Sequence, residues 1–270
     1  MVATNRLVFG GVFAVLILIM VWRLSATLRV LITLWRRPQT TETALVPGET
    51  IAVEGEVFVD ESAIATDRIF EATPRDIGLY VWRAAFNSAG NYTYDSERGE
   101  LQTARSSFAS GLETGRVGVS IGNRDVYVDP SWLCQTYDSE PLSEITIGER
   151  NVSLPLGLSQ RLFDAPYHHL TTVGECPSGA LSDILDVKIH DDRTDEFVVE
   201  GRGVPSGAQL FVSGTVRIEN GRPTIVGTED SPLLIADSGR GGLRGQLLGA
   251  ILKKSVRLAL VIGLGVLLLG

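Results

Sequence analysis

The sequence predicts a mainly β fold, with a single small barrel- or sandwich-like β domain between hydrophobic membrane segments. Residues 7–22 form a run without a charged side chain. Alternation of apolar and polar residues, which is typical of strands with one buried face, recurs between residues 51 and 227. A second hydrophobic run covers residues 258–270. We therefore expect a β domain that is held at a membrane.

The N-terminal segment, residues 1–37, is predicted to be a membrane anchor that spans from about residue 7 to residue 30. The uncharged run alone rises about 24 Å as a helix, so the span extends past Trp22, with Arg23 and Arg29 snorkelling toward the headgroups. A cleaved signal peptide is the alternative interpretation. Because the apolar pattern continues and no A-x-A-type cleavage site precedes the arginines, we expect a retained anchor.

The acidic β domain is assigned to residues 38–237. Its expected strands alternate apolar and polar residues and are rich in β-branched side chains. They cover residues 51–59, 77–86, 116–130, 196–201, 208–218 and 222–227. Turns that contain glycine, asparagine or proline separate them, and no amphipathic helix of ten or more residues is expected within the domain.

Two of these strands carry the same pattern, G-x-x-I-x-V-x-G-x-V, with leucine in place of isoleucine in the second copy. Gly48 begins the first copy and Gly207 begins the second, and a Val-Pro pair precedes each. The pattern predicts a turn followed by a strand with inward aliphatic residues, whose mid-strand glycine permits a bulge or a tight bend. The repeat therefore predicts that both strands take equivalent places in one barrel or sandwich.

The C-terminal region divides into a glycine-rich linker, residues 238–252, and a hydrophobic membrane segment, residues 253–270. Thirteen residues follow Arg257, which is about 20 Å of helix, whereas a bilayer has about 30 Å of hydrocarbon. Three arrangements stay open: a second anchor that begins earlier with snorkelling lysines, a hairpin that enters one leaflet, or a span whose end lies outside this sequence.

The middle of the chain, residues 38–252, is strongly acidic. It holds all 32 acidic residues but only 16 of the 24 basic residues, a net charge of −16. Nucleic acid is therefore not an expected partner, because phosphate binding requires positive side chains. The chain has three lysines and 21 arginines, and an acidic, lysine-poor surface suits strong salt, so we predict a halophilic protein. A GC-rich genome would explain the arginine preference but not the acid excess.

Basic residues flank the domain side of both hydrophobic runs, which by the positive-inside rule places the domain in the cytoplasm. Two features favour the exterior: glycosylation sequons at Asn91 and Asn151, and a Cys134–Cys176 bridge that an oxidising compartment would allow. The sequence leaves open whether the cysteines pair. We expect a cell-membrane protein with a cytoplasmic domain, and the alternative is an exported, glycosylated envelope protein.

No constellation of residues predicts a catalytic, cofactor-binding or metal site. His168 and His169 follow Asp164, and His190 precedes two aspartates, without the spacing of metal ligands. Ser120 lies in a G-x-S-x-G pattern, but a turn and a strand follow it instead of a helix. An unrecognised hydrolase would use Ser120 or Asp164 with His168 or His169. Other polar and aromatic residues are assigned to a loop (Ser106, Ser107 and Ser110) or to the core and its rim (Tyr80, Trp82, Tyr127 and Trp132).

The order of segments and the motif that begins at Gly48 resemble the beside-a-membrane, or GIDE, domain of Mulan-type membrane E3 ubiquitin ligases. Similar stretches are AIATDRIFEATPRDIGLYVWRA, RVGVSIGNRDVYVDP and EFVVEGRGVPSGAQLFVSGTV, and the resemblance covers roughly residues 45–235. Ligases of that family carry a RING, whose two zinc sites need about eight Cys or His ligands. This sequence has two cysteines and three histidines, so the resemblance implies a RING-less domain.

From the residues and the resemblance together, we expect a protein-binding or scaffolding module at the membrane face. Its expected partners are the lipid bilayer and an unknown protein, without nucleic acid or a cofactor. The resemblance also implies an alternative, an E3-ligase-like protein, although the zinc ligands of a RING are missing.

Overall fold

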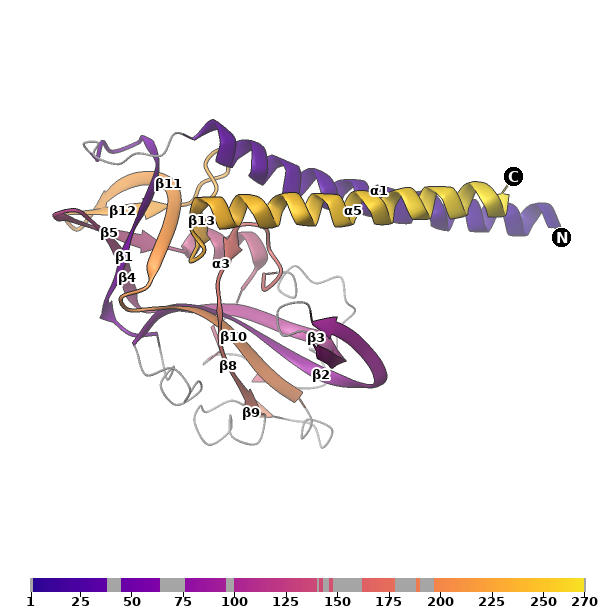
Figure 1. Ribbon diagram of the computed structural model, residues 1–270, viewed down its shortest axis with the longest axis horizontal. Helices are drawn as coiled ribbons and strands as arrows, with labels where there is room; N and C mark the ends of the chain where they lie inside the picture. Colours follow the sequence, from indigo (N-terminus) through magenta and orange to yellow (C-terminus); the bar gives the residue numbers. More distant parts are fainter. Residues whose placement is uncertain are drawn as a thin grey trace. The chain divides into compact units, whose positions relative to one another are not determined.

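The computed structural model describes residues 2–37, 45–63, 76–95, 100–139, 141–142, 146–147, 162–177, 188–189 and 197–269. The chain divides into two compact units. One unit combines Met1–Pro38 with Arg240–Gly270 and is a pair of helices, and the other, Gln39–Gly239, is mainly β. Figure 1 shows the elements of each unit.

Within the described residues, five strands of the β unit close a barrel. Around the ring they follow in the order β1 (Thr50–Glu61), β4 (Arg116–Ile121), β5 (Arg124–Asp129), β12 (Arg222–Val226) and β11 (Gln209–Glu219), and β11 pairs back with β1. The β5–β12 pair is parallel and the other four pairs are antiparallel. This order and these directions match an OB-type Greek-key barrel. The predicted small barrel is confirmed.

Two further short strands and one helix complete the barrel. β13 (Leu234–Ala236) pairs with β11, and β7 (His168–His169) pairs with β13. The helix α3 (Ser131–Tyr137) follows β5 and contributes the fully buried Leu133 to the barrel core. Aliphatic residues fill the interior, as the period-2 pattern predicted: Ile51, Val53, Val57, Val119, Val126, Leu210, Val212, Val216 and Ile225.

The repeated motif explains how the barrel closes. β1 and β11 carry the two copies and pair with each other. The mid-strand glycine of each copy lies opposite the first aliphatic residue of the other, since Gly55 pairs with Leu210 and Gly214 pairs with Ile51. The leading glycines adopt the positive φ values that favour glycine, 88° at Gly48 and 78° at Gly207. The prediction that the two strands take equivalent places is confirmed.

Each mid-strand glycine also makes room for the backbone of a neighbouring strand. A Cβ added to Gly55 would lie 2.3 Å from the carbonyl oxygen of Ser120 on β4. A Cβ added to Gly214 would lie 2.6 Å from the carbonyl oxygen of Val226 on β12. The two copies therefore use glycine for the same purpose on the two sides of the closing pair.

A second sheet lies beside the barrel and was not expected from the sequence. Its order is β3 (Glu100–Thr114), β2 (Ile77–Asp95), β10 (Phe197–Pro205) and β8 (Thr172–Pro177), all antiparallel (Figure 1). One of its faces joins the barrel core through Leu79, Val81, Leu112 and Val204. The other face forms a separate cluster with Tyr80, Trp82, Phe108 and Phe197. Two short strands, β6 (Thr146–Ile147) and β9 (Lys188–Ile189), pair in parallel.

The prediction of a loop at Ser106, Ser107 and Ser110 is wrong, because all three lie on β3. β3 pairs with β2, which carries bulky aromatic residues on the face of the second cluster. Trp82 lies opposite Gly111 in the register, and Ser110 is itself buried. The remaining expected strands are confirmed, namely β1, β2, the β4–β5 hairpin, β10, β11 and β12. Two of them are longer than expected, since β2 continues past residue 86 to Asp95 and β10 continues past residue 201 to Pro205.

The helical unit is an antiparallel pair of α1 (Val2–Arg36) and α5 (Gly239–Leu269) (Figure 1). Arg240 Nη2 donates a hydrogen bond of 2.7 Å to the carbonyl oxygen of Leu34 in the last turn of α1. Halfway along, Lys254 Nζ donates to Thr27 Oγ1 at 2.6 Å. Further on, a Cβ added to Gly265 would lie 3.4 Å from the Phe13 ring. These contacts pair the helices over most of their length.

The prediction of a glycine-rich linker at residues 238–252 is wrong, because α5 begins at Gly239 and continues through this segment. Glycine in a helix interior costs about 1 kcal/mol relative to alanine. Leu243 and Leu247, one turn apart, are 2% and 4% exposed, and their burial together with the Arg240 contacts offsets that cost. The hydrophobic segment 253–270 continues the same helix, and its role as a membrane segment stays a prediction.

Within the described part of the chain, one helix is long and apolar enough to cross a membrane, the Gly10–Arg36 portion of α1. Only 6% of its most apolar stretch is buried, which distinguishes it from the core helix of a soluble protein. Large apolar side chains are exposed along it, including Val15 at 56% and Leu18 at 68%. These properties fit a membrane anchor, and a signal sequence shares them.

Candidate functional site

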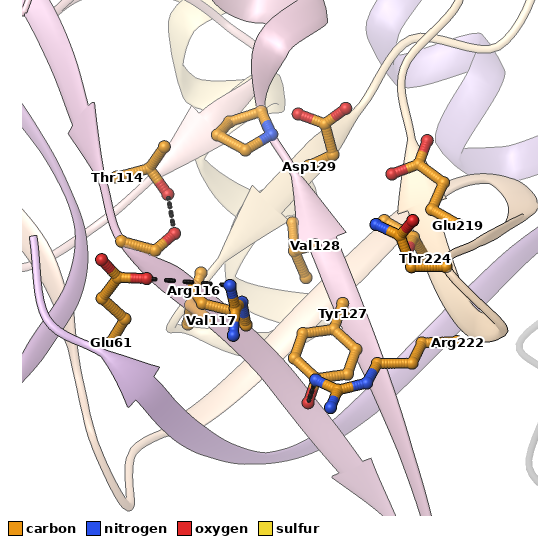
Figure 2. Close-up of a pocket in the computed structure, with 13 residues that line it drawn as sticks. Glu61, Thr114, Arg116, Val117, Tyr127, Val128, Asp129, Glu219, Arg222 and Thr224 are labelled. Atoms are coloured by element: carbon orange, nitrogen blue, oxygen red, sulfur yellow. Dashed lines mark hydrogen bonds and ion pairs between the residues drawn. The ribbon is translucent and has the colours of Figure 1, made fainter.

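A polar groove of about 600 Å³ lies on the outer surface of the barrel. It crosses β4, β5 and β12, and the ends of β1 and β3 and the β11–β12 turn border it (Figure 2). Its lining residues are Glu61, Thr114, Gly115, Arg116, Val117, Tyr127, Val128, Asp129, Pro130, Glu219, Asn220, Arg222 and Thr224.

A bulge in β1 places two consecutive carboxylates at the groove. Val59 pairs with Val117 and Glu61 pairs with Arg116, so that Asp60 is the additional residue between them. Bulges redirect side chains that strict alternation would send to opposite faces. Gly115 is required beside this bulge, because a Cβ there would lie 1.9 Å from the carbonyl oxygen of Glu61.

Tyr127 and Arg222 form the centre of the groove. The Tyr127 hydroxyl donates a hydrogen bond to Asp60 Oδ2 at 2.7 Å, and Arg222 Nη1 donates to the same hydroxyl oxygen at 2.8 Å. The guanidinium carbon of Arg222 lies 5.2 Å from the centroid of the Tyr127 ring, and Figure 2 shows the two side chains together. The hydrogen bond to Asp60 raises the pKa of Tyr127, so the phenol stays protonated at neutral pH.

Phe58, on β1, supports this centre across β4, the strand that lies between β1 and β5. Its ring meets that of Tyr127 edge to face, with 5.2 Å between centroids. Room for Phe58 comes from Gly118, where a Cβ would lie 2.4 Å from the Phe58 ring. The first glycine of the G-x-S-x-G pattern is thus explained by packing, and the second, Gly122, by its φ of 60° in the β4–β5 turn.

The groove lining also includes a second arginine, Arg116 on β4. Arg116 lies 3.9 Å from Glu61, with both side chains more than half exposed. Asp129 accepts hydrogen bonds from the backbone N–H of Ser131, at 2.8 Å, and from its hydroxyl, which anchors the start of α3. The groove therefore presents two guanidinium groups, one phenol and several carboxylates.

The ion pairs at the groove are weak enough to be exchanged for a ligand. Arg222 lies 3.7 Å from Asp60, and their side chains are 55% and 40% exposed. Exposed pairs of this kind contribute at most about 1 kcal/mol. Both guanidiniums are consequently available to a carboxylate of a partner at small cost. None of the lining residues is a histidine or a cysteine.

Ser120 and His168, two residues of the hydrolase alternative, are hydrogen-bonded to other groups instead of to each other. Ser120 Oγ donates to Asp125 Oδ1 at 2.6 Å, within the β4–β5 hairpin. His168 is buried on β7, and its Nε2 donates to the carbonyl oxygen of Leu162 at 2.6 Å. Burial lowers the pKa of His168 to about 4, so its imidazole is neutral at physiological pH.

His169, which follows His168 on β7, contacts the residues that follow β13. His169 Nδ1 lies 3.1 Å from Ser238 Oγ and 3.6 Å from Asp237 Oδ1. Because the hydroxyl and the carboxylate meet the same ring nitrogen, these contacts differ from a catalytic triad, in which they occupy opposite nitrogens. Among the described residues, no cluster of three or more His, Cys, Asp or Glu side chains is arranged to hold a metal.

The two cysteines are free thiols in separate clusters. Cys134 packs against the barrel core and Cys176 is buried in the second cluster. Burial raises the pKa of Cys134, which keeps it a thiol. Asn91 lies on β2, whereas Asn151 and the sequence from His190 to Asp192 are outside the described residues.

Sequence reasoning placed the aromatic residues only in part. Tyr80 and Trp82 are fully buried as expected, and Trp132 packs against Gly227. Tyr127, in contrast, lines the groove, and its partners Asp60, Arg116 and Arg222 were not singled out. The polar residues at the outward positions of the 116–130 hairpin could have indicated a polar surface. Their contact with Arg222, however, depends on the closure of the barrel, which the sequence does not show.

The chain matches no protein-family model, no curated protein and no solved structure. The case for its function therefore rests on the groove and on the helix pair.

Proposed function

We propose that this protein is a membrane-anchored β-barrel module that binds a partner protein through the groove around Tyr127 and Arg222. The observation that carries the proposal is the meeting of an exposed arginine–tyrosine pair with a second arginine, Arg116, on a closed barrel. Tyrosine and arginine are enriched among residues that dominate the binding energy of protein interfaces. Rigid strands hold them in place before a partner arrives.

The charges of the groove favour a protein segment over a nucleic acid. Arg116 and Arg222 are suited to bidentate recognition of a carboxylate. The carboxylates of Asp60, Glu61 and Asp129 surround them, and these would repel a phosphate backbone. We propose a partner segment that offers an acidic side chain to Arg222 together with a polar flank.

Membrane attachment is the second part of the proposal. Exposed apolar side chains along α1 favour an anchor, and the contacts from α5 favour its retention. Arg240, Lys254 and Gly265 of α5 meet α1 near its end, its middle and its beginning, respectively. Cleavage after a signal sequence would remove much of this interface. The GIDE-like interpretation stays a prediction.

We place the domain in the cytoplasm, because basic residues mark its side of the membrane. A cysteine at the exposed Asn123 of the β4–β5 turn tests this placement, since Cys134 is half-buried and Cys176 is buried. An impermeant maleimide is expected to label Asn123→Cys only after lysis of the cells. Labelling of intact cells would favour the envelope-protein alternative.

A photoreactive residue at Thr114, an exposed residue of the groove lining, tests the binding function. Irradiated host cells are expected to yield one discrete cross-linked partner. Arg222→Ala should lower its yield about tenfold or more, the effect of removing a dominant interface residue. Arg124→Ala is the matched control, because this exposed arginine lies on β5, the strand of Tyr127, but outside the groove lining. Absence of an adduct, or equal loss in both variants, would contradict the proposal.

A further inference from the structure

Four basic side chains lie at one level of the helix pair, and we refer to them as the basic collar: Arg23, Lys253, Lys254 and Arg257. The level is fixed by Lys254, whose Nζ lies 2.6 Å from Thr27 Oγ1 and 3.4 Å from the carbonyl oxygen of Arg23. From Lys253 to Arg257 the helix rises only about 6 Å. Arg23, Lys253 and Arg257 are exposed, so they point away from the pair.

The collar separates two kinds of surface on the helices. Toward the N-terminus of α1, the residues from Gly10 to Trp22 are uncharged, and their exposed apolar side chains include Leu18 at 68%. Beyond Arg257, α5 is likewise uncharged, and Leu260 is 68% exposed. On the other side of the collar, basic residues recur along the pair: Arg29 on α1, then Arg36, Arg37, Arg240 and Arg244 near its end.

We propose that the basic collar binds the phosphates of anionic lipids and marks the surface of the leaflet on the domain side. This inference rests on the proposed membrane attachment. Neither helix contains an acidic residue that could neutralise the collar. Anionic headgroups supply the missing charge, and each basic residue near such a surface contributes about 1 kcal/mol to attraction.

The alternative boundary, at Arg36 and Arg244, would place the collar in hydrocarbon. Arg23 lies 13 residues before Arg36, which is about 20 Å along the helix and past the midplane of a hydrocarbon core about 30 Å thick. Four cations at that depth would each cost about 3 kcal/mol or more. With the collar at the surface, the stems of Arg23 and Lys253 snorkel, and Leu28 and Leu252 enter the interfacial layer.

Two native tryptophans report which boundary is correct. Trp22 lies beside the collar and is 55% exposed, and Trp35 lies about 20 Å away and is 56% exposed. The full chain is reconstituted in vesicles of phosphatidylcholine and phosphatidylglycerol, with bromine on the acyl chains of one lipid at a time. The wild type is compared with Trp22→Phe and with Trp35→Phe. The barrel tryptophans contribute equally to the wild type and to each variant, so the quenching that a variant loses is the quenching of the replaced tryptophan.

We expect brominated phosphatidylglycerol to quench Trp22 at least about two-fold more strongly than the same fraction of brominated phosphatidylcholine does, which is a quenching ratio of about two or more. R23Q/R257Q, with one change on each helix, should bring this ratio close to one. R36Q/R244Q is the matched control and should leave it unchanged. Both variants retain the Lys254–Thr27 contact.

Three outcomes separate the claims. Equal quenching of Trp22 by both lipids would contradict the proposal that the basic collar binds anionic lipids. A preference that appears at Trp35 and is lost in R36Q/R244Q would also overturn it and place the boundary at Arg36. Absence of quenching at both tryptophans would show that the helices do not enter the bilayer, in which case the proposed membrane attachment itself fails.

Discussion

At the scale of single residues, glycines decide how closely the barrel strands approach. Gly55 and Gly214 face neighbouring carbonyl oxygens, and Gly118 faces the ring of Phe58 that supports Tyr127. Gly48 and Gly207 instead supply positive φ values before each strand. The barrel and its groove therefore depend on positions where a single methyl group is too large.

Gly55→Ala and Gly214→Ala are each expected to lower the free energy of unfolding by about 1–3 kcal/mol, because a backbone carbonyl cannot move aside as a side chain does. Chemical denaturation of the solubilised protein measures this change. Gly245→Ala is the control, since nothing lies within 4 Å of its added Cβ. It should be neutral or stabilising, and equal losses in all three variants would show that the close approach is not the cause.

His168 makes stability depend on pH. Burial lowers its pKa to about 4 in the folded protein, whereas an unfolded histidine titrates near 6.5. Between these values the unfolded chain binds a proton that the folded chain excludes, so the free energy of unfolding falls as the pH falls from 6.5 to 4. The loss attributable to this residue is about 3 kcal/mol.

His168→Gln keeps a donor for the Leu162 carbonyl but cannot titrate. Denaturation midpoints at pH 7 and pH 4.5 should therefore differ less in this variant than in the wild type. His169→Gln, which changes the neighbouring and partly exposed histidine, should retain the wild-type difference. If His168→Gln lost stability on acidification as the wild type does, another group would be responsible.

At the scale of elements, the helix pair is held by polar contacts from α5 to the backbone of α1. Arg240 Nη2 donates to the carbonyl oxygens of Leu34 and Arg37, at 2.7 and 2.6 Å. Carbonyl groups in the last turn of a helix lack partners within that helix, and a cation there also interacts favourably with the helix dipole. Arg244 adds a stacking contact with Trp35, 5.5 Å from its ring centroid.

Arg240→Gln is expected to loosen the last turn of α1. Hydrogen bonds from a charged donor contribute about 1.5–3 kcal/mol, so amide hydrogen exchange around residues 33–37 should become about tenfold faster or more. Arg244→Gln, one turn further along α5, should have a smaller effect because it removes only the exposed stacking contact. The same acceleration in both variants would argue against a specific role of Arg240.

Element prediction from the sequence succeeded where one residue pattern determined one strand. The alternation in β1 and the repeat shared with β11 predicted both strands, and the apolar run predicted α1. It failed where tertiary contacts decide. β3 has few large apolar residues and exists because β2 pairs with it, and the start of α5 is helical because it packs as part of a pair despite its glycines.

The groove could not be predicted for a related reason. Tyr127 is close to Arg222 only because β5 and β12, almost 100 residues apart in the chain, pair in parallel around the barrel. The bulge at Asp60 adds a carboxylate that strict alternation would send to the other face. The sequence therefore led to the hypothesis of a binding module but did not identify the residues of the groove.

At the scale of the whole molecule, the chain combines a barrel that carries a polar groove with a helix pair that has an apolar surface. The sequence separates their charges, since every acidic residue lies between residues 38 and 252. That separation suits a domain that remains in water while its helices enter lipid. The central claim is that α1 is retained as a membrane anchor.

Alkaline carbonate extraction of host membranes, followed by the intact mass of the extracted chain, tests this claim most directly. We expect the protein in the membrane pellet, with a mass that includes residues 1–37. A chain found in the soluble fraction, with a mass that lacks the residues before about position 25, would identify α1 as a signal sequence and contradict the account.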